Sequence, residues 1–89
     1  MKYVFTQQAW EDYLYWQTTD RQMIKRINTL LKDISRNKYT GIGKPEPLKD
    51  NLSGYWSRRV NNTHRLVYRL TDDSGDICEI YQCKGHYGS

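Results

Sequence analysis

One carboxylate, several arginines and a histidine–tyrosine pair are the side chains of this sequence that could do chemistry on a phosphodiester. They are Glu46, Arg58, Arg59, Arg65, His86 and Tyr87. A carboxylate can serve as a base when its surroundings raise its pKa toward neutrality, and a histidine can serve as an acid there. Arginine is always charged, and its planar fork matches the oxygens of a phosphate.

These parts are the ones that cleavage of RNA without a metal requires. A base removes the proton of the 2′-hydroxyl, cations neutralise the pentavalent phosphorane, and an acid protonates the leaving 5′ oxygen. General acid–base catalysis contributes typically about 10²–10⁴-fold, and stabilisation of the developing charge is usually the larger effect. Each side chain taken singly is also common on protein surfaces. The chemistry therefore depends on whether the fold brings them together.

The other reactive side chains match no familiar site. Cys78 and Cys83 are expected on one strand, facing opposite sides and roughly 16 Å apart, which is too far for a disulfide. His64 and His86 together with the cysteines fit no zinc-ligand spacing, and no glycine-rich phosphate loop precedes a helix. We therefore expect two unpaired thiols, no metal and no cofactor.

Length and composition limit what can position these groups. The 89 residues suffice for a single domain over 1–89, with a formal charge of +4 and 13% aromatic residues. Such a basic, aromatic-rich chain suits nucleic acid or an acidic protein partner, although +4 alone is also an ordinary solubility charge. No apolar run approaches the roughly 20 residues of a membrane span, and the N-terminus lacks a signal-peptide core. We expect a small cytoplasmic domain that does not enter a membrane.

A short β-prone segment at 2–5 precedes the first expected helix, for which Thr6 is the predicted N-cap. One face of that helix is expected to carry Ala9, Trp10, Tyr13, Leu14 and Gln17. The residues expected on its other faces are Glu11, Asp12 and Tyr15.

The second helix has the clearest pattern. Thr19-Asp20-Arg21-Gln22 fits a capping box with Thr19 as N-cap and Gln22 reaching back to it. Its apolar stripe repeats at three and four residues and consists of Met23, Ile24, Ile27, Leu30, Leu31 and Ile34. The basic residues of this helix fall mostly off the stripe, and a solvated basic face is the favoured interpretation for them.

Glycines and prolines interrupt the pattern between residues 37 and 54, which predicts a long surface loop. Pro45 and Pro47 fix φ on either side of Glu46 and push Lys44 and Glu46 toward extended backbone. The loop thus provides a stiff mounting for one carboxylate, with Lys44 before it and Lys49 after it.

The last third of the chain predicts strands at 55–60, 64–71 and 76–84, joined by turns at 61–63 and 72–75. On the middle strand, Leu66, Tyr68 and Leu70 share one face and Arg65, Val67 and Arg69 the other. The order β-α-α-β-β-β predicts an α+β domain, in which two N-terminal helices pack on one face of an antiparallel sheet.

The connection between the first two of these strands decides which arginine lies beside Arg65. A three- or five-residue connection pairs Arg59 with Arg65, whereas a two- or four-residue connection places Arg58 there. Asn61-Asn62 is itself an attractive two-residue turn, so the turn residues leave both pairings open.

Five strings of the chain carry a resemblance to a known family. They are Trp10–Gln17 (WEDYLYWQ), Gly43–Lys49 (GKPEPLK), Asn51–Arg59 (NLSGYWSRR), His64–Tyr68 (HRLVY) and the pair His86-Tyr87. Together they closely resemble the YoeB/Txe toxins, within the RelE-like group of bacterial toxin–antitoxin ribonucleases, over essentially the whole chain. The family usually ends at the His-Tyr pair, whereas Gly88-Ser89 follow here.

The resemblance implies a microbial-ribonuclease-like (RelE-like) fold and an endoribonuclease that cuts mRNA in the ribosomal A site. The roles it implies are general base for Glu46, general acid for His86, phosphate stabilisation for Arg65, and RNA orientation or stacking for Tyr87. It also implies that Lys49 and Arg59 assist at the phosphate, and Lys44 is expected to bind RNA with them. This favours Arg59 over Arg58 and hence an odd-length connection.

The resemblance further implies partners for a chain of this charge. They are a cognate antitoxin, whose acidic segment folds on the basic toxin, and the 70S ribosome with its mRNA. A homodimer is a further alternative, because relatives include dimers. Two other functions remain alternatives: a toxin of the same fold that inhibits a protein such as gyrase, and a plain RNA-binding module. Toxins of the gyrase-inhibiting kind lack the Glu and the terminal His, both of which are present here.

Overall fold

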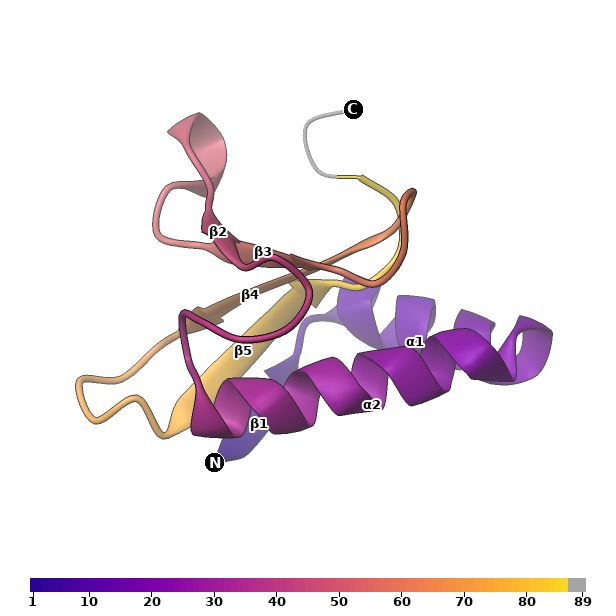
Figure 1. Ribbon diagram of the computed structural model, residues 1–89, viewed down its shortest axis with the longest axis horizontal. Coiled ribbons are helices and arrows are strands. Elements are labelled where there is room, and N and C mark those ends of the chain that lie inside the picture. Colours follow the sequence, from indigo (N-terminus) through magenta and orange to yellow (C-terminus); the bar gives the residue numbers. More distant parts are fainter. Residues whose placement is uncertain (87–89) are drawn as a thin grey trace.

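The computed structural model describes residues 1–86 (Figure 1). Its elements are β1 (Lys2–Phe5), α1 (Gln7–Thr19), α2 (Arg21–Arg36), β2 (Glu46–Pro47), the 3₁₀ helix η1 (Asp50–Leu52), β3 (Trp56–Arg59), β4 (Arg65–Leu70) and β5 (Ile77–Gln82). The strands form one five-stranded sheet in the order β1-β5-β4-β3-β2. Both helices pack on the same face of that sheet, which confirms the predicted α+β architecture (Figure 1).

The sheet contains the three consecutive antiparallel strands predicted for the last third of the chain, and two further strands, β1 and β2. β3, β4 and β5 pair in antiparallel fashion, whereas β1 joins β5 in parallel. β2 extends the opposite edge by pairing with β3. The prediction of an irregular loop across 37–54 was therefore wrong for β2 and η1, which are too short for sequence periodicity to reveal. Strands β3, β4 and β5 are one or two residues shorter at each end than predicted.

One predicted helix cap is confirmed and the other is wrong. The Thr6 hydroxyl accepts a hydrogen bond from the Ala9 N–H (3.1 Å) and caps α1. Thr19 does not cap α2, because it is the last residue of α1 and its hydroxyl donates to the Tyr15 carbonyl (2.6 Å). The cap is Asp20, whose carboxylate accepts from the Gln22 N–H (3.1 Å). A carboxylate also suits the positive end of the α2 dipole.

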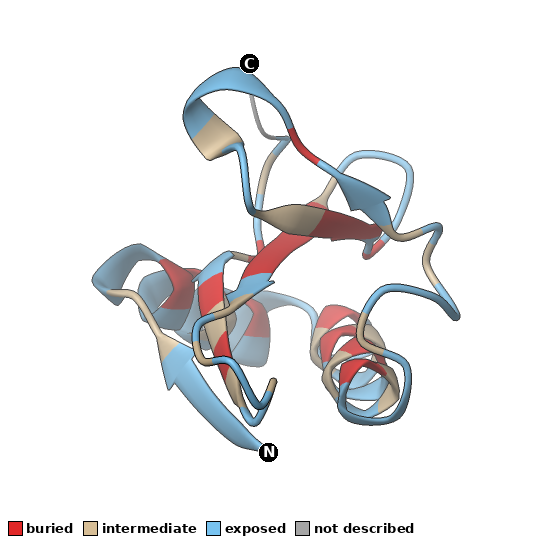
Figure 2. Cartoon of the chain, turned by 90° about the vertical axis from the view of Figure 1, so that its left-hand side faces the viewer, coloured by how far each residue is buried: buried red, intermediate tan, exposed pale blue. Residues whose placement is uncertain are grey.

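The apolar stripe of α2 forms one side of the core, as predicted. Met23, Ile27, Leu30 and Ile34 are buried, and Ile24 and Leu31 are partly buried against them. The sheet supplies the other side of the core with Val60, Leu66, Tyr68, Cys78 and Ile80. Much of the buried chain lies where the helices and the sheet face each other (Figure 2). Full burial of one Leu or Ile contributes about 1.5–3 kcal/mol, so this stripe stabilises the fold substantially.

The predicted inner face of α1 was partly wrong. Trp10 and Leu14 are exposed (47% and 39%), whereas Asp12, expected on another face, is buried. The cause is a polar contact made after β5: the Asp12 carboxylate accepts the backbone N–H of Cys83 (3.1 Å) and a hydrogen bond from Gln8 (2.8 Å). α1 therefore turns a carboxylate, together with Trp16, toward the end of β5.

Cys78 and Cys83 are unpaired thiols, as predicted, but they do not face opposite sides. Both belong to the same core cluster, because β5 ends at Gln82 and Cys83 lies beyond it. Burial raises the pKa of each thiol to about 12, so both are protonated near neutral pH. No helix among residues 1–86 has the length and apolar character needed to cross a membrane.

Candidate functional site

The face of the sheet opposite to the helices gathers three of the predicted site residues. Glu46 on β2 pairs with Ser57 on β3, and Arg59 on β3 pairs with Arg65 on β4. Directly opposed residues point to the same side, and residues two apart on a strand share a face. Glu46, Arg59 and Arg65 therefore lie on one side of the sheet. We call this side the open face.

The turn between β3 and β4 settles the pairing that the sequence left open. Five residues, 60–64, connect the strands, so the connection is odd and Arg59 lies opposite Arg65. The side chain of Asn61 shapes this turn, since its Oδ1 accepts the N–H groups of Thr63 (2.9 Å) and His64 (2.7 Å). Asn61 thus serves an extended five-residue turn, and not the two-residue hairpin that its type also permits.

Glu46 is exposed, and the chain that precedes it is tied to β3. The Gly43 carbonyl accepts the Arg59 N–H (2.7 Å). A Cβ at Gly43 would lie 2.8 Å from Leu30, so glycine is required for this close approach. Lys44 has φ 51°, which contradicts its predicted extended backbone. The chain turns there because Gly43 is anchored to β3 while Glu46 must enter the sheet as β2.

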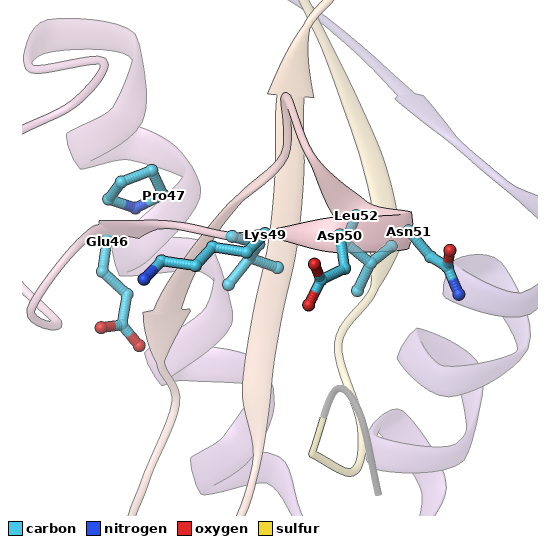
Figure 3. A pocket seen from close by; sticks show the side chains of 7 residues that line it. Glu46, Pro47, Lys49, Asp50, Asn51 and Leu52 are labelled. Atoms are coloured by element: carbon cyan, nitrogen blue, oxygen red, sulfur yellow. The ribbon is translucent and has the colours of Figure 1, made fainter.

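The segment after Glu46 folds back around a hollow that is open to solvent. A cavity of about 500 Å³ is lined by Glu46, Pro47, Leu48, Lys49, Asp50, Asn51 and Leu52. In Figure 3 the Lys49 side chain extends back along the segment toward Glu46, whereas Asp50 and Asn51 lie at its other end. Asp50 has φ 56°, and non-glycine residues in such conformations cost roughly 1–3 kcal/mol and cluster at functional sites. The segment is thus bent tightly beside an exposed carboxylate and a lysine.

Arg59 and Arg65 place two positive charges directly opposite each other. Arg59 is exposed, whereas Arg65 is buried, with its guanidinium donating to the carbonyls of Asn61 (2.8 Å) and His64 (3.3 Å). Like charges at directly opposed positions destabilise a sheet, and neutral carbonyls do not cancel the charge of Arg65. A bound anion would relieve this repulsion, so the pair is suited to a phosphate.

The chain after β5 leads His86 to Arg65. The Cys83 carbonyl accepts the indole N–H of Trp16 (2.9 Å), and the Gly85 carbonyl accepts the Arg65 N–H (2.9 Å). His86 follows at once and is exposed. Its backbone therefore starts next to the buried arginine. Tyr87, the fourth predicted catalytic residue, lies outside the described residues, as do Gly88 and Ser89.

Arg58 has a role that sequence reasoning missed. It is fully buried on the helix side of β3 and forms an ion pair with Asp33 of α2 (2.5 Å). Its other acceptors are the Tyr68 hydroxyl and the carbonyls of Asn37, Thr40 and Ile42. The hydrogen bond from Arg58, and next that from the Ile42 N–H, lower the pKa of Asp33. Strand alternation could have indicated this role, because one of two consecutive arginines must face the helices.

The fold places the chain in a known structural class. A mutant of YafQ from Escherichia coli superposes with a TM-score of 0.77 at 20% identity, over 96% of this chain and 92% of that one. That likeness establishes the fold, which is of the RelE/YafQ kind. This is a small α+β fold with two N-terminal helices and a mostly antiparallel five-stranded sheet.

The family follows from closer matches. The model for the YoeB-like toxin of bacterial type II toxin–antitoxin systems matches residues 5–87. Toxin YoeB of Escherichia coli K12 is 54% identical over 87 residues, which cover 98% of this chain and 100% of that protein. The chain belongs to the YoeB toxin family.

Solved structures of relatives agree with the fold described above. A YoeB/ParE toxin from Agrobacterium tumefaciens has a TM-score of 0.93 and 47% identity, covering 98% of this chain and 100% of that one. A YoeB dimer from Staphylococcus aureus has a TM-score of 0.88 and 53% identity, covering 98% of each chain. The toxin in a heterotetrameric YoeB–YefM toxin–antitoxin complex from the same organism has a TM-score of 0.87 and 53% identity, again covering 98% of each chain.

Proposed function

We propose that this chain is a ribosome-dependent endoribonuclease that cleaves mRNA in the A site and thereby blocks translation. The observation that carries the proposal is the shared open face of Glu46, Arg59 and Arg65, together with the bond that ties Gly85, and hence the start of His86, to the backbone of Arg65. Membership of the YoeB family supports the same conclusion.

In the proposed mechanism, Glu46 removes the proton of a 2′-hydroxyl, whose oxygen attacks the adjacent phosphorus. The bond from phosphorus to the 5′ oxygen breaks, and His86 protonates that oxygen as it leaves. The products are a 2′,3′-cyclic phosphate and a free 5′-hydroxyl, so the reaction consumes no water in this step. Glu46 lies on an edge strand and His86 beyond β5, which suits a base and an acid acting on opposite sides of one phosphate.

Arg65 and Arg59 would stabilise the charge that develops on the phosphate. The carbonyls of Asn61 and His64 hold the Arg65 guanidinium in place before substrate binds. Preorganised charge of this kind is usually the largest single contribution to catalysis. Lys44 and Lys49 flank Glu46 on the same segment, where they would guide the RNA backbone. Tyr87 remains the proposed stacking residue.

We propose an antitoxin as the inhibiting partner. The net charge of +4 and the exposed Arg59 suit an acidic segment that folds on binding. A toxin of the same family from Staphylococcus aureus forms a complex with the antitoxin YefM, and another structure of it is a dimer. The proposed substrate places the activity on ribosomes in the cytoplasm.

Cleavage of mRNA on programmed ribosomes tests the proposal. We expect Glu46→Gln and His86→Gln each to lower the single-turnover cleavage rate by about 10²–10⁴-fold, the usual contribution of general acid–base catalysis. Glu11→Gln is the matched control, because Glu11 is an exposed carboxylate on α1 that bonds Gln7. It should cleave at the wild-type rate.

Wild-type cleavage by Glu46→Gln or His86→Gln would remove the corresponding role. Toxicity that persists in Glu46→Gln without any mRNA cleavage would instead favour a toxin of this fold that inhibits a protein such as gyrase. Salt-dependent RNA binding without cleavage by the wild type would favour a plain RNA-binding module.

A further inference from the structure

Both peptide groups next to Gly85 are held by His64, the last residue of the turn between β3 and β4, and by Arg65, the first residue of β4. The Gly85 N–H donates to Nδ1 of His64 (2.8 Å), and the Gly85 carbonyl accepts the N–H of Arg65 (2.9 Å). His86 follows Gly85 directly. These two hydrogen bonds are therefore the last described contacts of the backbone before the proposed acid.

The His64 ring is itself fixed in place. Its edge-to-face contact with Trp16 has a centroid distance of 4.8 Å and an interplanar angle of 76°. Its backbone belongs to the Asn61 turn, since the His64 carbonyl accepts the Val60 N–H (2.9 Å). A backbone N–H can only donate, so Nδ1 of His64 must present its lone pair to Gly85. The ring thus offers a fixed acceptor to a specific amide.

Gly85 makes this acceptor necessary. Its φ is +84°, and a Cβ at this position would meet nothing within 4 Å. A glycine populates positive and negative φ about equally when nothing selects between them. Without the bond to His64, the peptide before Gly85 could rotate, and the direction in which the chain enters His86 would change with it.

We propose that His64 is a positioning residue for RNA cleavage, which holds the Gly85 peptide so that the His86 imidazole reaches the leaving oxygen. The inference rests on the proposed function, and in particular on the role of His86 as general acid. His64 itself need not touch the RNA. Its effect is on geometry, and misplacement of a catalytic group by about 1 Å can cost on the order of 10²-fold in rate.

Two variants that differ by one methylene separate positioning from packing. In His64→Asn, the amide Oδ1 occupies the place of Nδ1 and can still accept the Gly85 N–H, so we expect a kcat within about threefold of wild type. In His64→Gln, the acceptor lies one carbon further out and the bond is lost. We expect its kcat to fall about 10- to 100-fold while KM stays unchanged, because ground-state binding of the ribosome does not use His86.

Hydrogen exchange of the Gly85 amide provides a readout that does not depend on catalysis. We expect protection in the wild type and in His64→Asn, and about tenfold faster exchange in His64→Gln, since an amide exchanges in proportion to the fraction of time that its hydrogen bond is open. The Thr71 amide, bonded to the Ile77 carbonyl (3.0 Å) in the distant hairpin, is the internal reference and should not change. Unaltered exchange at Thr71 also shows that each variant is folded.

The outcomes distinguish this inference from the proposed function. Wild-type kcat in His64→Gln, alongside an inactive His86→Gln, would overturn the positioning role alone. Unchanged Gly85 exchange in His64→Gln would overturn it even if kcat fell. Wild-type cleavage in His86→Gln would refute the proposed acid, and the positioning role with it. A reduced kcat in His64→Asn equal to that of His64→Gln would show that the acceptor is not what matters.

Discussion

The two faces of β3 use neighbouring arginines for opposite purposes. Arg58 is fully buried on the helix side, where it binds Asp33, the Tyr68 hydroxyl and three loop carbonyls. Arg59 is exposed on the open face, directly opposite Arg65. Arginine therefore serves two purposes at consecutive positions of β3. Arg58 holds the 37–42 loop to the sheet, and Arg59 adds positive charge to the open face. Strand alternation keeps the two tasks apart.

The largest expected effect is the loss of the buried arginine. Arg58→Met should lower the free energy of unfolding by about 3–5 kcal/mol, because removing one member of a buried ion pair leaves its partners without compensation. Arg59→Met is the matched control and should change it by less than about 0.5 kcal/mol, as surface substitutions do. Urea denaturation of both variants measures the difference. Equal destabilisation would show that the two faces are not divided in this way.

A second expected effect is on the open face and concerns catalysis. Arg65→Lys keeps the charge but loses the planar fork that bonds the carbonyls of Asn61 and His64. We expect cleavage on ribosomes to slow by about 10²-fold, similar to the loss of a preorganised donor elsewhere. Arg69 lies on the same face but pairs with Glu79 (2.9 Å). The cleavage rate of Arg69→Lys, the matched control, should therefore stay within about threefold of the wild-type rate. Equal rates for the two variants would contradict a special role for Arg65.

The smallest effect is the contribution of Asp33 at low pH. The Arg58 hydrogen bond lowers the pKa of Asp33 in the folded state, so its charge stabilises the fold above the unfolded pKa, about 3.9. That stability is lost as the pH falls through the folded pKa. The stability gap between wild type and Asp33→Asn should therefore be complete at neutral pH and shrink below about pH 4. Denaturation at several pH values measures it. A gap that does not change with pH would show that the Asp33 charge does not stabilise the fold. In an Arg58→Met background the shrinkage should be smaller, because the hydrogen bonds from the Ile42 N–H and from Asn37 remain.

Predictions from the sequence were most accurate where one hydrophobic periodicity, helical or strand-like, extends over many residues. The α2 stripe from Met23 to Ile34 and the alternation along β4 were correct, because one misplaced residue does not change a repeated pattern. Predictions failed where a single tertiary contact decided the outcome. Asp12 is buried because it accepts the Cys83 N–H, and that contact joins residues 71 positions apart. Thr19 and Asp20 are both good N-cap residues, and which of them caps α2 depends on where α1 ends.

The site was predictable in its residue types but not in its geometry. Whether Arg58 or Arg59 faces Arg65 depends on one residue more or less in the turn. That length depends on the two N–H groups that the Asn61 side chain accepts. The left-handed backbone of Lys44 likewise follows from an anchor at Gly43 that is visible only in three dimensions. The hydrogen bond from the Gly85 N–H to His64 could not be predicted from the spacing of these two residues in the sequence.

The parallel pairing of β1 with β5 has a consequence for the order in which the protein is made. A growing polypeptide emerges from its N-terminus, so β1 and both helices are synthesised well before β5, which lies between β1 and β4 in the sheet. The first strand has no neighbour to pair with until Ile77–Gln82 has been added, and Asp12 and Trp16 must wait for Cys83. A protein proposed to cleave mRNA on ribosomes is thus incompletely folded for most of the time that it is attached to the ribosome that makes it.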